Sequence, residues 1–156
     1  MAAKPVGLLV DTHLLLWWAS MPEQLPAAAR SRLERSDQPV VFSDVSIWEV
    51  GIKASLGRSD FQVNPLFLRM GLLQEGFREL PIQVNHLLAV QHLPWVHRDP
   101  FDRLLVAQAA EERLSLLTAD RILLGYGDGV RWVVRMTMRA VWSVSYTHLT
   151  LPTKRI

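Results

Sequence analysis

The stretch Gly7-Leu8-Leu9-Val10-Asp11 is a short apolar run that a carboxylate ends. Unbroken apolar runs of this length are typical of buried strands in parallel sheets. Glu49, Asp102 and Asp120 stand in comparable places, at or just past an apolar strand-like or helical segment. In an α/β fold the carboxyl ends of the strands meet at one edge, where ligands bind. We therefore expect these four acids to converge although they lie far apart in the sequence.

Strand-like and helix-like segments alternate along the rest of the chain. This alternation predicts the α/β class, with a central, mostly parallel sheet covered by helices. Apolar runs predict strands at residues 7–10, 39–42, 77–82, 114–118 and 130–134. Periodicity, N-caps and prolines predict helices at 13–19, 26–35, 45–56, from Asn64-Pro65 onward, at 83–91 and at 100–113.

Composition narrows the class of protein. A hydrophobic fraction of 49% and a charged fraction of 21% indicate a globular chain rather than a disordered one. The chain has no cysteine, which excludes disulfides, thiolate metal ligands and a cysteine nucleophile. No apolar run is long enough to span a membrane, and the N-terminal run is too short for a signal peptide. We expect a cytoplasmic protein that is not exported.

The net charge gives no argument for nucleic-acid binding, because 17 basic residues nearly balance 15 acidic ones. Two of the bases, Lys154 and Arg155, lie in a stretch from about Ser143 onward that has no acid and no amphipathic period. That stretch resembles translated sequencing-adapter read-through. We therefore expect one domain over residues 1–133 and a non-native or disordered tail over 134–156.

Several carboxylates in one pocket repel each other unless a cation joins them. Oxygen ligands without any cysteine favour Mg²⁺ or Mn²⁺, and metal sites of this kind usually act on phosphate esters. Ordinary structural roles stay open beside this interpretation. Asp11 could cap the following helix, and Asp120 could end a strand in a turn. Glu49 could pair with Lys53 one helical turn on.

Four motifs in this order resemble the PIN-domain nucleases, and most closely the toxins of VapBC-type toxin–antitoxin pairs. The resemblance covers the chain from about Val6 to Val133. Its most specific block is Asp-Pro-Phe-Asp-Arg-Leu-Leu-Val-Ala-Gln-Ala, at residues 99–109. The other three are Leu8-Leu9-Val10-Asp11-Thr12-His13, Ser46-Ile47-Trp48-Glu49-Val50-Gly51-Ile52-Lys53 and Leu117-Thr118-Ala119-Asp120.

The resemblance implies a three-layer PIN-like fold and a Mg²⁺- or Mn²⁺-dependent endoribonuclease, a hydrolase of RNA phosphodiester bonds. The family's acidic quartet falls on Asp11, Glu49, Asp102 and Asp120, as catalytic residues and metal ligands. The resemblance also implies a homodimer and a cognate VapB-like antitoxin. An arginine of such an antitoxin would pair well with the carboxylates.

Residues beside the quartet are weaker candidates. Thr118 could hydrogen-bond a carboxylate or a water. Asp99 is a site candidate too, although capping the helix that follows suits it better than catalysis. His97 and Arg98 precede that helix and could touch phosphate.

Other classes of function remain as alternatives. A catalytically silent PIN-like domain that binds RNA or protein would have no need for crowded carboxylates. A receiver domain also places aspartates at strand ends, but it requires a lysine after a late strand. This sequence has no lysine between Lys53 and Lys154. A flap-endonuclease-like enzyme would need more chain for its DNA-holding elements.

Overall fold

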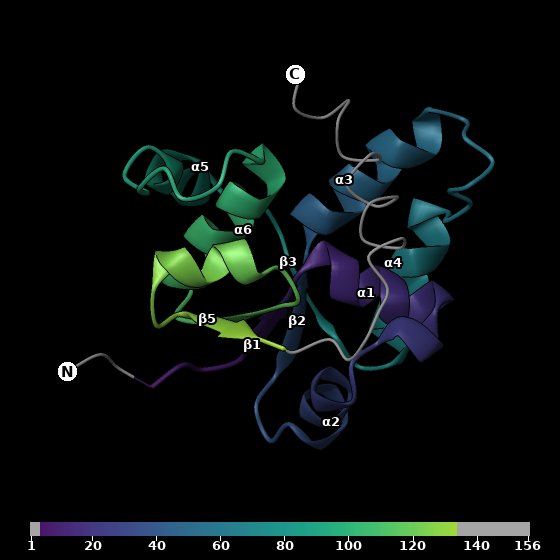
Figure 1. The fold of residues 1–156 in the computed structure, drawn as a ribbon, viewed down its shortest axis with the longest axis horizontal. Helices are drawn as coiled ribbons and strands as arrows, with labels where there is room; N and C mark the ends of the chain where they lie inside the picture. The colour runs from purple at the N-terminus through teal and green to yellow at the C-terminus, as the bar shows by residue number, and fades with distance from the viewer. Residues whose placement is uncertain (1–3, 134–156) are drawn as a thin grey trace.

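A parallel sheet forms the centre of the fold in the computed structural model, which describes residues 4–133 (Figure 1). Within these residues the sheet has five strands in the order β3-β2-β1-β4-β5, and every neighbouring pair runs parallel. The predicted α/β class with a mostly parallel sheet is confirmed. The strands are β1 (Leu8–Val10), β2 (Val40–Ser43), β3 (Arg78–Leu80), β4 (Ser115–Thr118) and β5 (Val130–Trp132).

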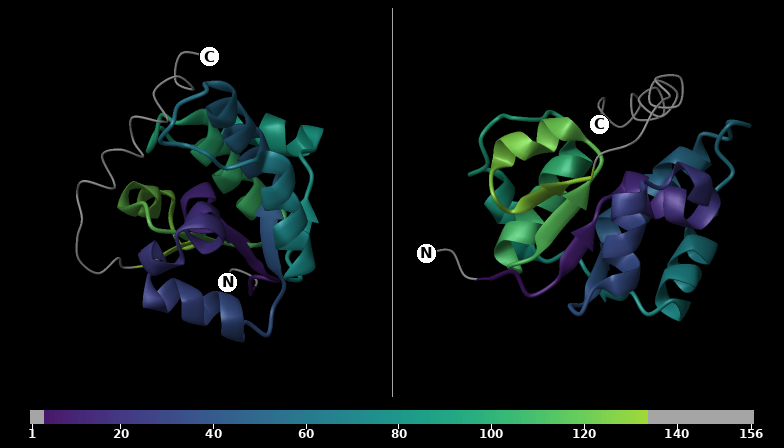
Figure 2. Two further views of the ribbon diagram at one scale, coloured as in Figure 1. Left: turned by 90° about the vertical axis from the view of Figure 1, so that its right-hand side faces the viewer. Right: turned by 60° about the horizontal axis from the view of Figure 1, so that its bottom comes forward.

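Helices pack on both faces of this sheet, which gives the expected three layers (Figure 2). Side chains of consecutive strand residues point to opposite faces. Leu9 and Leu116 accordingly join Leu105 of α6 in one apolar core. Val10 and Leu117 join residues of α1 and α4 in the other. The helices are α1 (Thr12–Ser20), α2 (Ala27–Arg35), α3 (Asp44–Ser55), α4 (Pro65–Gln74), α5 (Val84–Val90) and α6 (Pro100–Glu111).

The observed elements differ from the predicted ones mainly at their ends. The strand expected at 77–82 covers only Arg78–Leu80. Pro26 lies at the N-cap position, one residue before α2 begins at Ala27. Two short 3-10 helices, Pro22–Gln24 and Arg121–Tyr126, have no counterpart in the sequence prediction. The expected tail at 134–156 lies outside the described residues, as does the last residue of the strand predicted at 130–134. Among the described helices, none has both the length and the apolarity needed to cross a lipid bilayer.

The strand order creates a switch point between β1 and β4. From β1 the chain adds β2 and then β3 on one side, and it later adds β4 and β5 on the other. The connections at the carboxyl ends of β1 and β4 therefore leave in opposite directions and open a crevice, which is where open α/β sheets bind ligands. Asp11 follows β1 directly, and Asp120 stands two residues after the end of β4.

The entry to β1 requires a glycine. A Cβ on Gly7 would lie 2.9 Å from the Pro39 carbonyl oxygen and 3.0 Å from Leu114 Cδ2. We expect Gly7→Ala to lower the free energy of unfolding by about 1–3 kcal/mol, the usual effect of overpacking. Gly71→Ala in α4 is the matched control, because a Cβ there meets nothing within 4 Å. It should stabilise the protein by about 0.5–1 kcal/mol. Urea denaturation of both variants tests the pair, and equal effects would contradict it.

Candidate active site and metal centre

Asp11 is buried at the carboxyl end of β1, and both of its carboxylate oxygens accept hydrogen bonds. Oδ1 accepts from the backbone N–H of Leu14 at 3.0 Å, which makes Asp11 the N-cap of α1. Oδ2 accepts from the hydroxyl of Thr118, a fully buried residue at the end of β4. Helix capping and membership of the acid cluster are therefore compatible roles for Asp11. Thr118 contacts a carboxylate, as its position in the sequence suggested.

Burial raises the pKa of Asp11 from 3.8 to about 7. The hydrogen bonds from Thr118 and Leu14 oppose this rise, whereas the negative charges of Asp120 and Glu49 add to it. Desolvation disfavours the charged form of any buried carboxyl group. Without a cation, Asp11 therefore holds its proton up to nearly neutral pH.

Glu49 lies on α3 beside a buried lysine. The Lys53 ammonium is 2.9 Å from Glu49 Oε2, and both side chains are almost completely buried. The i,i+4 pair considered from the sequence thus exists, but in the interior rather than on an exposed helix face. Glu49 Oε1 is also buried, and it has no hydrogen-bond partner among the described residues. One oxygen of Glu49 is therefore paired with an ammonium, and the other has its lone pairs available to accept a ligand.

Asp99 and Asp102 lie at the start of α6. Asp99 is the N-cap, with its Oδ1 accepting the N–H groups of Phe101 at 2.8 Å and Asp102 at 3.4 Å. Capping fixes the first turn and thereby places Asp102, which is 8% exposed. Burial raises the pKa of Asp102 well above its ordinary value, and the charges of Asp99, Glu49, Asp11 and Asp120 add to this rise.

Asp120 differs from the other acids because its pKa is lowered. Burial would raise it, but the hydrogen bonds from His97 and the Ile122 backbone N–H, together with the electrostatic effects of His97 and His13, outweigh burial. His97 Nε2 is 3.1 Å from Asp120 Oδ2 and 3.4 Å from Asp102 Oδ2. The sequence suggested a phosphate contact for His97 and gave no sign of this one. Arg98, the next residue, is exposed.

The structure thus brings the four predicted acids to one place and puts them within electrostatic reach of one another. Like charges in a buried site need a counter-ion, and Glu49 Oε1 is a buried acceptor that such an ion would satisfy. Carboxylate oxygens suit hard divalent cations such as Mg²⁺ and Mn²⁺. The residues present therefore fit a divalent metal ion.

Fold and site together define an α/β domain whose acids converge at the switch point of a parallel sheet. The family model described as PIN domain matches residues 8–128. This chain belongs to the PIN-domain family, so the resemblance inferred from its motifs is confirmed.

Comparisons with individual proteins support this family assignment. The chain is 31% identical over 117 residues to Ribonuclease VapC22 from Mycobacterium tuberculosis, over 74% of this chain and 88% of that protein. A toxin–antitoxin complex from Klebsiella pneumoniae contains a similar fold, with a TM-score of 0.61 and 21% identity over 83% of this chain and 99% of that chain. VapBC2 from Rickettsia felis, solved bound to a DNA fragment from its promoter, is also similar, with a TM-score of 0.60. Its sequence is 10% identical, over 81% of this chain and 96% of that chain. The two solved structures support the fold alone.

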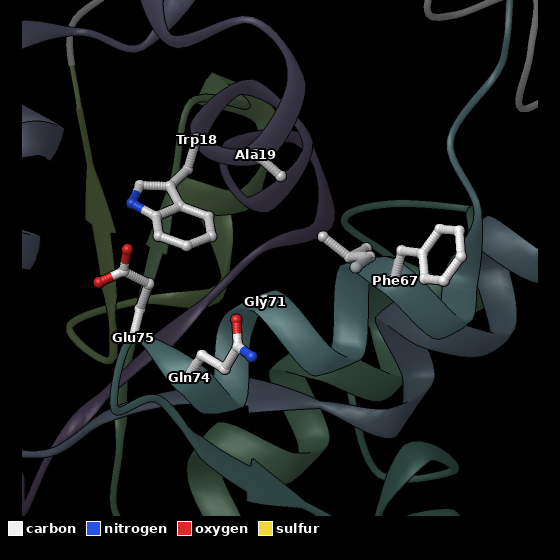
Figure 3. A pocket seen from close by; sticks show the side chains of 7 residues that line it. Trp18, Ala19, Phe67, Gly71, Gln74 and Glu75 are labelled. Carbon is white, nitrogen blue, oxygen red and sulfur yellow. The ribbon is translucent and has the colours of Figure 1, made fainter.

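A pocket lies between α1 and α4 and contains none of the four acids. Figure 3 shows Trp18 and Ala19 of α1 on one side of it and Phe67, Gly71, Gln74 and Glu75 on the other. Phe67 also belongs to an apolar surface of α4, whose large side chains are each at least 40% exposed, namely Leu66, Phe67, Met70 and Leu73.

The raised pKa values predict how the stability of the metal-free protein depends on pH. Folded Asp11 titrates at about 7, whereas an ordinary aspartate titrates at 3.8. Between these values the folded state binds more protons than the unfolded state, so stability falls as the pH rises from about 4 to about 7. For Asp11 alone the fall is on the order of 4 kcal/mol. Asp102 acts in the same direction, and Asp120, with its lowered pKa, opposes it only in the acid range below 3.8.

Urea denaturation in EDTA across this pH range measures the effect. Asp11→Asn cannot ionise and should show a shallower fall than the wild type. Added Mg²⁺ or Mn²⁺ should reduce the fall in the wild type, because the ion binds the ionised carboxylates. Identical pH profiles for the wild type and Asp11→Asn would contradict the assignment.

The buried pair of Lys53 and Glu49 generates a separate stability prediction. Lys53→Met keeps most of the side-chain volume but leaves Glu49 without its ammonium partner. We expect a loss of about 3–5 kcal/mol in EDTA, the usual effect of breaking a buried ion pair. Arg58→Met is the control, because its pair with Asp60 is exposed and should contribute less than about 1 kcal/mol. Similar losses in both variants would contradict the distinction.

Proposed function

We propose that this chain is a metal-dependent endoribonuclease and the toxin of a VapBC-type toxin–antitoxin pair. The convergence of buried carboxylates at the switch point carries the proposal, above all the unpartnered oxygen of Glu49. Without a cation such a cluster only destabilises a protein, through desolvation and repulsion. The relative from Mycobacterium tuberculosis is named a ribonuclease, which supports RNA as the substrate.

In this proposal Asp11, Glu49, Asp102 and Asp120 hold one or two Mg²⁺ or Mn²⁺ ions. When bound, the ion supplies an activated water for in-line attack on the phosphodiester and offsets the charge that develops on the phosphate oxygens. Asp120 enters this arrangement already ionised, because its pKa is lowered. Asp11 and Asp102 have raised pKa values, so both would release their protons on binding an ion.

Neighbouring residues orient the carboxylates before an ion arrives. Thr118 and the Leu14 N–H fix the plane of the Asp11 carboxylate. Asp99 caps α6 and so determines where Asp102 lies. Lys53 holds Glu49 Oε2, so Oε1 is the oxygen of Glu49 that would contact a bound ion. Arg98 is exposed beside the site and is suited to contact a phosphate of the RNA backbone.

The toxin assignment implies protein partners. Within residues 4–133 two apolar surfaces are exposed, the α4 surface that includes Phe67 of the pocket in Figure 3 and a stripe of Val84, Leu87 and Leu88 on α5. Exposed apolar surfaces of this kind usually mark protein contacts. We assign them to a VapB-like antitoxin and to a second copy of this chain in a homodimer. An antitoxin arginine that reached the carboxylates would replace part of the cation's charge. A toxin acting on cellular RNA is expected in the cytoplasm.

Cleavage of a mixed cellular RNA pool tests the nuclease. We expect the purified protein to cut RNA with Mg²⁺ or Mn²⁺ and to leave it intact with EDTA. Asp11→Asn and Asp102→Asn should each reduce cleavage activity by more than roughly 10–100-fold. That range is typical for removing a residue that only hydrogen-bonds a metal ligand, and these two residues are proposed to be ligands themselves. Asp60→Asn is the matched control, because Asp60 lies in an exposed ion pair and its loss should leave cleavage unchanged.

The cut ends, mapped by sequencing, identify the RNA target. Intact RNA from a folded wild-type protein that also binds no divalent ion by calorimetry would overturn the nuclease proposal. It would favour the catalytically silent PIN-like domain that binds RNA or protein.

A further inference from the structure

We propose that His97 is a positioning residue of the metal centre, a hydrogen-bond donor that holds Asp120 beside Asp102 without binding the ion itself. The inference rests on the proposed metal-dependent function. His97, Asp102 and Asp120 each place one ligand-type atom within 4.8 Å of the others, which is the spacing that a shared metal ion would have. The question is therefore whether His97 completes the ligand set or supports it.

The hydrogen bond to Nδ1 answers this question. The backbone N–H of Asp99 donates to His97 Nδ1 at 3.0 Å. A ring nitrogen that accepts a hydrogen bond carries no proton, so the proton of the neutral imidazole is on Nε2. Nε2 lies 3.1 Å from Asp120 Oδ2 and therefore donates to this carboxylate. Metal-binding histidines show the reverse pattern, with a lone pair on the metal and the other ring N–H donating to an acceptor.

The surroundings keep His97 in this arrangement. Its backbone N–H donates to the Tyr126 hydroxyl at 3.0 Å, and its carbonyl accepts from Arg103 Nη1 at 3.4 Å. Arg103 is buried and also donates to the carbonyl of Pro94 in the same loop and to that of Val90 at the end of α5. Binding a metal through Nε2 would require the proton to move to Nδ1, where it would face the Asp99 N–H. The loop is thus built around the donor form of the ring.

The N–H donor of His97 lies between two carboxylates that would otherwise repel each other. Asp102 belongs to α6 and Asp120 to the segment after β4, and both carboxylates are partly or fully shielded from water. His97 Nε2 is 3.4 Å from Asp102 Oδ2, so its polar N–H group lies between the two acids. Each carboxylate oxygen has a second lone pair, so Asp120 can accept from His97 and Ile122 and still bind an ion. The ligand set is then entirely oxygen, which favours Mg²⁺ and Mn²⁺.

Two spectroscopic measurements separate a donor from a ligand. In the metal-free protein, long-range proton–nitrogen correlation spectra should show His97 protonated at Nε2, with its signals assigned by their loss in His97→Gln. In the Mn²⁺-loaded protein, pulsed electron paramagnetic resonance should show no nitrogen bound directly to the ion. A proton on Nδ1, or a nitrogen coupling that disappears in His97→Gln, would overturn the proposal.

Calorimetric Mn²⁺ titration measures the positioning effect. We expect His97→Ala to weaken Mn²⁺ binding about 10–100-fold, as is usual when the partner of a ligand is lost. His97→Gln retains an N–H donor and should recover most of that loss. His92→Ala, at an exposed histidine, is the control and should leave binding unchanged. Equal weakening in the alanine and glutamine variants, or none in either, would overturn the proposal.

These experiments distinguish the two proposals. If the wild type binds no Mn²⁺, the metal-dependent function fails, and the tautomer of His97 in the metal-free protein still decides whether it is a donor to Asp120. If Mn²⁺ binds but RNA is not cut, the nuclease proposal fails while the titrations still test His97.

Discussion

Repulsion among buried carboxylates is the constraint on which the rest of this structure depends. Burial and like charges together raise the pKa of Asp11 and of Asp102. The residues around the acids supply compensation in several forms. Thr118 and His97 donate hydrogen bonds, Lys53 supplies a buried positive charge, and the N-termini of α1 and α6 supply backbone N–H groups. Among the residues that the structure describes, Glu49 Oε1 is the buried carboxylate oxygen that these groups leave without a hydrogen bond.

This compensation also holds the elements of the fold together. The bond from Thr118 to Asp11 joins β4 to the start of α1 across the switch point, and His97 joins the loop before α6 to the end of β4. The groups that stabilise the carboxylate charges therefore also determine the geometry of the crevice. A site made of separate strand ends needs such ties, because each element is otherwise positioned only by its own apolar face.

The sequence predicted the parallel sheet and the place of the four acids because both depend on local patterns. Short apolar runs indicate buried strands, and residues that follow such strands share one edge of the sheet. The N-cap role of Asp99 could be predicted from the sequence as well, because capping depends on local sequence. The contact of His97 with Asp120 could not be predicted, because it spans 23 residues and depends on a loop whose shape is set by contacts with Arg103 and Tyr126.

The opposite pKa shifts within the cluster imply a link between protons and metal. In the metal-free protein, protons on Asp11 and Asp102 remove negative charge that a cation would otherwise offset. Asp120 keeps its charge because hydrogen bonds from His97 and Ile122 and the nearby histidines lower its pKa. An ion that binds must displace those protons, so its affinity rises with pH until both acids are ionised. Above these raised pKa values the described residues compensate the ionised cluster only in part, so an ion held there as proposed would stabilise the fold. In the proposed function, the cation that supports the chemistry would therefore also stabilise the fold.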